Sequence, residues 1–104
     1  MIIIRKGRQR EFIGRLQFFN DLPIKNQQSF KEIKEFLNEY FNKDVEAYVY
    51  GSYLHGFSDE YSDYDILINE AFDRNEIDGL IFKKLNYEAN IIFSKDKISN
   101  ILIP

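Results

Sequence analysis

The sequence predicts a single small domain, residues 1–104, of the α/β class and α+β in arrangement, with a mixed β-sheet flanked by helices. The chain has 104 residues, of which 44% are hydrophobic and 30% charged, as in an ordinary globular domain. Short runs rich in β-branched and aromatic residues predict strands. Segments with apolar residues at helical spacing lie around these runs and predict helices.

The first 25 residues are the least regular part of the chain, and we expect residues 1–25 to form an N-terminal extension. Residues 1–5 predict a short strand. Residues 9–19 fit a helix, but Gly14 and the aromatic residues weaken that interpretation. A hairpin that turns at Lys6-Gly7 is the alternative, and the sequence leaves both open.

A helix is predicted over residues 29–42. Ser29 and Glu32 have the spacing of a capping box, in which a hydroxyl and a carboxylate satisfy the free amides of a helix start. Apolar residues then recur at helical period: Phe30, Ile33, Leu37 and Tyr40 with Phe41.

Three strands and three further helices are predicted beyond this segment. The strands are placed at residues 45–50, 63–69 and 87–93. The helices are a short one that begins at Ser52, a second that Asp73 and Glu76 cap, and a last one from Ser94 to Leu102. A long link joins the first two strands, so their pairing direction is left open.

The net charge of −3 conceals an uneven distribution. Residues 1–15 hold five basic residues and one acid, whereas the rest of the chain holds nine basic and sixteen acidic residues. Such a basic run is usually a solvated surface, and the sharper alternative is a patch for phosphate or an acidic partner. The acidic balance of the whole chain argues against nucleic acid as a partner.

Composition also bounds the cellular setting. The sequence contains no cysteine, which excludes disulfides and thiolate metal sites. No apolar run approaches the roughly 18 residues that a membrane span needs, and the start of the chain lacks the pattern of a signal peptide. We therefore expect no membrane association and a cytoplasmic location. Whether the chain forms an oligomer is left open.

Two carboxylates, Asp63 and Asp65, stand at the head of the second predicted strand. Side chains alternate across a strand, so both lie on one face, where they repel each other. A divalent cation resolves this repulsion, and Mg²⁺ is typically held by one or two carboxylates together with substrate phosphates. Because a lone D-x-D pattern more often marks a solvated turn, the pair needs a second signal.

Gly51 and Ser52 supply that signal at the end of the preceding predicted strand. Glycine lets the backbone approach a phosphate without a Cβ in the way, and serine adds a hydroxyl. The two motifs together predict a triphosphate site between a Gly-Ser turn and a metal-bearing pair of aspartates.

The stretch "GSYLHGFSDEYSDYDILI" at residues 51–68 resembles the signature of the nucleotidyltransferase superfamily related to DNA polymerase beta. It is most similar to the minimal nucleotidyltransferases of bacteria and phages. Their pattern is G-S, ten residues and D-x-D, then an apolar strand, and Gly56 and Ser62 also match it. The resemblance covers residues 29–93, has no counterpart for residues 1–25, and implies a nucleotidyltransferase-like fold.

The resemblance also implies roles for individual residues. Four of them come from the motif itself: Asp63 and Asp65 as catalytic ligands of Mg²⁺ or Mn²⁺, and Gly51 and Ser52 as nucleotide-binding residues. A third carboxylate on a later strand helps to bind the ion near the acceptor hydroxyl or acts as its base. The matching position here is Asn90, which is neutral. Glu88, two residues earlier on the same face, is the candidate substitute.

The implied activity is transfer of a nucleoside monophosphate, with AMP as the first candidate, from an NTP such as ATP to a hydroxyl, with release of pyrophosphate. Because the chain leaves little room for an acceptor-binding lobe, we expect the acceptor on another molecule. Minimal members often pair with a helical HEPN protein in toxin–antitoxin modules, which implies a HEPN partner and an antitoxin role. The alternative is a weak or inactive relative that acts as a nucleotide- or partner-binding module, which the neutral Asn90 favours.

Overall fold

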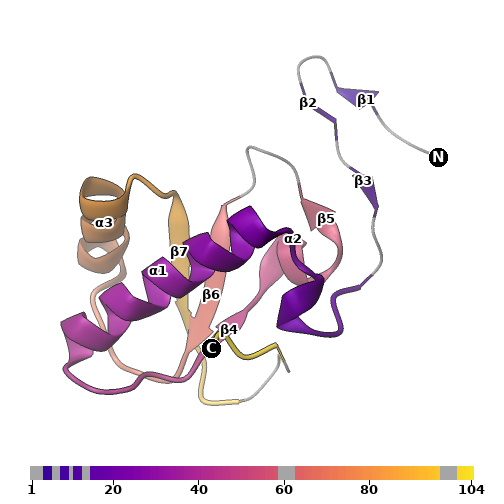
Figure 1. The fold of residues 1–104 in the computed structure, drawn as a ribbon. Coiled ribbons are helices and arrows are strands. Elements are labelled where there is room, and N and C mark those ends of the chain that lie inside the picture. Colours follow the sequence, from indigo (N-terminus) through magenta and orange to yellow (C-terminus); the bar gives the residue numbers. More distant parts are fainter. Residues whose placement is uncertain (1–3, 6–7, 10, 13–14, 59–62, 97–100) are drawn as a thin grey trace.

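The computed structural model describes residues 4–5, 8–9, 11–12, 15–58, 63–96 and 101–104. Its elements in chain order (Figure 1) are β1 (Ile4–Arg5), β2 (Arg8–Gln9), β3 (Glu11–Phe12), the 3-10 helix η1 (Phe19–Asp21), α1 (Ile24–Phe41), β4 (Ala47–Val49), α2 (Gly51–Leu54), β5 (Phe57–Ser58), β6 (Tyr64–Ile68), α3 (Arg74–Leu85) and β7 (Ala89–Phe93).

The mixed sheet predicted from the sequence is confirmed. Its strand order is β4-β6-β7, with β4 antiparallel and β7 parallel to the central strand β6. The short helix predicted at Ser52 is present as α2 and begins at Gly51. The predicted cap of α3 is also present, because the Asp73 carboxylate accepts the N–H of Glu76 at 3.2 Å.

Helix α1 begins earlier than predicted, and the predicted capping box at Ser29 and Glu32 is wrong. Pro23 occupies the N-cap position, where a proline loses no helical hydrogen bond. Ser29 therefore lies inside the helix, and its hydroxyl donates to the Lys25 carbonyl at 3.0 Å. The Glu32 carboxylate accepts instead from the Tyr87 hydroxyl at 2.6 Å. The helix ends at Phe41, and the left-handed backbone of the C-cap residue Asn42 closes the last turn.

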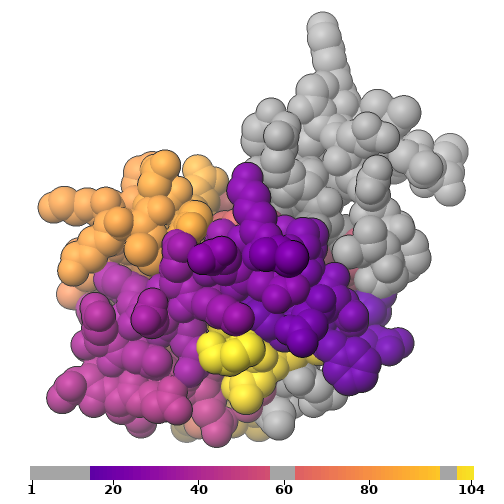
Figure 2. Space-filling model, in the orientation of Figure 1, coloured from indigo at the N-terminus to yellow at the C-terminus, as the bar shows by residue number. Residues whose placement is uncertain are grey.

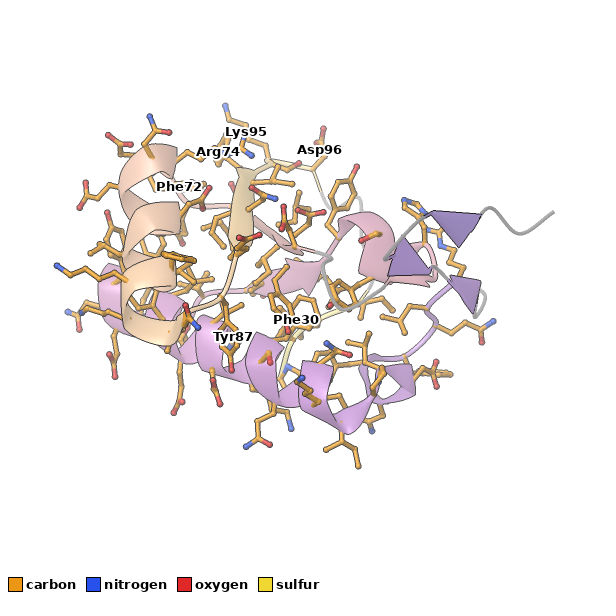
Figure 3. The ribbon with its side chains drawn as sticks, turned by 90° about the horizontal axis from the view of Figure 1, so that it is seen from above. Phe30, Phe72, Arg74, Tyr87, Lys95 and Asp96 are labelled. Carbon is orange, nitrogen blue, oxygen red and sulfur yellow. The ribbon has the colours of Figure 1, made fainter. Side chains whose placement is uncertain are left out.

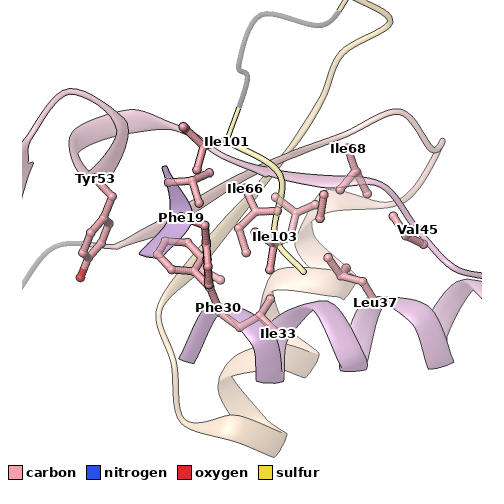
Figure 4. Close-up of a cluster of buried hydrophobic side chains, with 14 of the residues drawn as sticks. Phe19, Phe30, Ile33, Leu37, Val45, Tyr53, Ile66, Ile68, Ile101 and Ile103 are labelled. Carbon is pink, nitrogen blue, oxygen red and sulfur yellow. The ribbon is translucent and has the colours of Figure 1, made fainter. Parts of the chain in front are cut away.

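One face of the sheet packs against α1 and forms the core (Figure 4). Phe30, Ile33 and Leu37 of α1 are fully buried, as the predicted apolar stripe requires. They cluster with Ile66 and Ile68 of β6. Full burial of such a side chain contributes about 1.5–3 kcal/mol, so this layer is the main source of stability.

The described residues 4–5, 8–9 and 11–12 form strands rather than a helix. Arg5 of β1 pairs antiparallel with Arg8 of β2, as in the predicted hairpin, while Lys6 and Gly7 lie outside the described residues. β3 pairs antiparallel with β5. The alternative helix over residues 9–19 is wrong in the described part, since helical structure begins only at Phe19. Leu16, Phe19 and Leu22 are nevertheless buried and belong to the core cluster.

The helix predicted over residues 94–102 is also wrong in its described part, while residues 97–100 lie outside the described residues. Ser94 begins a bend, in which its hydroxyl donates to the Asp96 carbonyl at 2.8 Å. Ile103 donates its N–H to the Ala47 carbonyl at 2.8 Å, so the end of the chain runs along β4. Pairing of the chain end with the backbone groups at the edge of β4 prevails over the weak helical pattern of residues 94–102. Figure 2 shows this end, in yellow, against α1.

Asp78 of α3 fixes the helix to the outer edge of the sheet. Its carboxylate accepts the backbone N–H of Ile91 in β7 at 3.1 Å. Burial raises the pKa of Asp78, against the opposing effects of this hydrogen bond and of the Arg74 charge. The folded protein therefore favours the protonated carboxyl group more than the unfolded chain does. The stability that this difference contributes at low pH is lost as the pH rises through the raised pKa of Asp78.

Asp78→Asn should raise the free energy of unfolding at neutral pH. The amide oxygen still accepts from Ile91, whereas the charge that burial disfavours is gone. The gain over wild type should grow as the pH rises above the ordinary pKa of an aspartate, about 3.9, and through the raised pKa of Asp78. Urea unfolding at several pH values measures it, and a difference that does not vary with pH would contradict the assignment.

Candidate functional site

The turn after β4 lies directly against the head of β6. Tyr50 donates its N–H to the Asp65 carbonyl at 2.9 Å and precedes Gly51, whose φ is 69°. A Cβ placed on Gly51 would lie 2.0 Å from Asp65 Oδ2. Only glycine therefore fits here, for its backbone conformation and for its size. The space that glycine leaves open is taken by the Asp65 carboxylate, whereas the sequence interpretation assigned that space to a phosphate.

The parallel register between β6 and β7 assembles the polar centre of the site. Asp65 is the register partner of Asn90, and Tyr64 donates its N–H to the Glu88 carbonyl at 2.9 Å. Asn90 Nδ2 lies 3.1 Å from Asp63 Oδ2 and 3.0 Å from Asp65 Oδ1. One amide group thus bridges both predicted metal ligands, and all three side chains are half-buried.

Electrostatics at this centre disfavour negative charge in the absence of a cation. Burial raises the pKa of Asp65, and the nearby charge of Asp63 raises it further. The hydrogen bond from Asn90 and the positive charge of Arg74 act in the opposite direction. Arg74 was not foreseen from the sequence, because only the folded position of α3 brings it near Asp65.

The other predicted residues lie around this centre without joining it. Glu88 is exposed, and Ser52 is half-buried in α2. Among residues 15–58, 63–96 and 101–104, no three His, Cys, Asp or Glu side chains gather to hold a metal ion. The sequence thus anticipated where Asn90 lies, whereas its bond to both aspartates was not foreseen. The role of Glu88 as a third carboxylate stays a prediction.

An aromatic layer supports the site from the opposite face of β6. The Tyr64 ring stacks on Tyr53 with centroids 5.5 Å apart and meets Phe30 edge-on at 5.0 Å. Asn26 Nδ2 lies 3.3 Å from the Tyr53 hydroxyl, and Tyr87 contacts Tyr64 at 5.4 Å. Figure 3 shows Tyr87 beside α1, the helix that carries Phe30. Tyr53 and Tyr64 are therefore packing residues that fix the strand carrying both aspartates.

The donor set fits a hard divalent cation. Two carboxylates converge on one point, and the Asn90 amide also carries an oxygen that can face a cation. Oxygen ligands of this kind suit Mg²⁺ or Mn²⁺.

Residues 30–102 match the family model of the nucleotidyltransferase domain. This span contains the Gly51 turn, the aspartate pair and Asn90. No curated protein and no solved structure matches the chain. None of the helices in the described part of the chain is long and apolar enough to cross a membrane.

Gly51→Ala should destabilise the protein and displace Asp65. A positive φ costs a non-glycine residue about 1–2 kcal/mol, and the overlap with the carboxylate adds to this. Gly79→Ala is the matched control, because a Cβ added at Gly79 would meet nothing within 4 Å. Alanine at this helical position should stabilise α3 by about 1 kcal/mol. Urea unfolding of both variants tests the contact. Equal stability of Gly51→Ala and wild type would contradict it.

Proposed function

The chain belongs to the nucleotidyltransferase domain family, and on this premise we propose that it transfers a nucleoside monophosphate from an NTP to a hydroxyl group. ATP is the first candidate donor, and a partner protein or another molecule is the acceptor. The acceptor oxygen bonds to the α-phosphorus, the bond from that phosphorus to the bridging oxygen breaks, and pyrophosphate leaves. The hydroxyl proton passes to a base.

The observation that carries this proposal is the convergence of Asp63, Asp65 and Asn90 beside the Gly51 turn. Asp63 and Asp65 would hold Mg²⁺ or Mn²⁺, which when bound neutralises charge on the phosphates. The backbone of Gly51 and the hydroxyl of Ser52 would contact the triphosphate. Positioning and charge neutralisation are the main requirements of phosphoryl transfer, and these residues would provide both.

A second candidate is a nucleotide- or partner-binding module without turnover. It is favoured by the neutral side chain of Asn90, which cannot act as a base. A HEPN-type partner and an antitoxin role are compatible with either candidate, and a pull-down with such a partner tests them. Binding of nucleotide without release of pyrophosphate would select the second candidate.

Asp63→Asn and Asp65→Asn should each abolish magnesium-dependent binding of a non-hydrolysable ATP analogue. Each change removes one of two charges that would balance the ion, while the amide keeps the shape of the side chain. Isothermal titration with and without Mg²⁺ measures the loss. Asp96→Asn, at an exposed position, is the control for the same chemical change. Undiminished binding in both site variants would overturn the assignment.

Glu88→Gln should lower pyrophosphate release and leave the affinity for the ATP analogue unaltered. The exposed Glu88 carboxylate is free to face an acceptor, and general bases contribute about 10²–10⁴-fold in rate. Pyrophosphate release with water as the surrogate acceptor measures the effect. Glu39→Gln, on the exposed surface of α1, is the control. A rate equal to wild type would remove Glu88 from the site.

A further inference from the structure

The Asn90 amide makes two bonds to the groups that would hold the ion. Its Nδ2 atom lies within hydrogen-bond distance of one oxygen of Asp63 and one of Asp65. Ionised carboxylates carry acceptors only, so the amide must present N–H groups to both. The two hydrogens of Nδ2 are enough for one bond to each carboxylate.

These two bonds oppose the repulsion between the aspartates. Asp63 and Asp65 share one face of β6, and both are half-buried, so their charges are poorly screened. Hydrogen bonds to charged groups are stronger than those between neutral groups. The amide therefore holds both carboxylates in place and occupies the space between them, where a cation would also be attracted.

Given the proposed function, we propose that Asn90 stands in for the cation in the metal-free protein and makes binding of the ion depend on the nucleotide. An ion that approaches Asp63 and Asp65 competes with Nδ2 for the same oxygens, and the amide must turn its oxygen toward the ion. Because Asn90 is neutral, the centre offers two negative charges rather than three. The triphosphate supplies the remaining charge, so ion and NTP bind together and each strengthens the other.

Asn90→Ala separates this role from that of an ordinary ligand. If Asn90 only ligates the ion, its loss weakens ion binding. If Asn90 competes with the ion, its loss strengthens the binding of free Mn²⁺, by about tenfold for the release of charge-assisted hydrogen bonds. The metal-free variant should also unfold at a lower temperature than wild type, since the repulsion between the aspartates is no longer opposed. Mn²⁺ should restore that midpoint.

The experiment is a titration of Mn²⁺, followed by electron paramagnetic resonance, with and without the non-hydrolysable ATP analogue. Thermal unfolding of the metal-free proteins is the second readout. Wild type should bind free Mn²⁺ weakly and bind it at least about tenfold more tightly with the analogue. Asn90→Asp, which adds a third charge, should bind free Mn²⁺ more tightly and depend less on the analogue. Asn69→Ala, at an exposed position beyond the end of β6, is the control and should behave as wild type.

Two failures can be told apart. Weaker or equal binding of free Mn²⁺ by Asn90→Ala, in a series where wild type binds Mn²⁺ with the analogue, would overturn the role of Asn90 and leave the proposed function standing. Absence of Mn²⁺ binding in every protein, with and without the analogue, would overturn both. Should Asn90→Ala not fold, Asn90→Ser removes the same bonds with a polar side chain and gives the same comparison.

Discussion

The contact between Gly51 and the Asp65 carboxylate is the constraint on which the rest of the site depends. It exists because β4 and β6 pair with Val49 opposite Ile66, and because Tyr50 continues this pairing with a bond to the Asp65 carbonyl. A shift of one residue in this register would turn Asp65 toward the core. The buried residues of β4 and β6 thus determine not only stability but also where the carboxylate points.

The central strand β6 separates two environments by the alternation of its side chains. Tyr64, Ile66 and Ile68 face α1, whereas Asp65 faces the other way. The contacts of the Tyr64 ring with Phe30, Tyr53 and Tyr87 hold the start of the strand, at the residue between the two acids. A rigid strand start limits the displacement of the side chains that form the site.

Much of this arrangement could be predicted from local sequence. The three strands, α3 with its Asp73 cap and the aspartate pair depend on short-range patterns that dominate locally. The start of α1 could not be predicted, because Ser29 and Glu32 have the local pattern of a capping box. A tertiary contact overrides this pattern, since Glu32 accepts a hydrogen bond from Tyr87, a residue far along the chain. The bridge made by Asn90 was hidden for a related reason, since it depends on the parallel register of β6 and β7.

The path of the chain end has a consequence for association. Unpaired edge strands attract other strands and promote aggregation or strand exchange. Ile101 and Ile103 are buried against the core and occupy the outer side of β4, while Asp78 engages Ile91 at the opposite border of the sheet. Each border thus has backbone groups already bound within the same molecule. A partner protein would gain little by adding a strand at these positions, and side-chain surfaces are the better route for recognition.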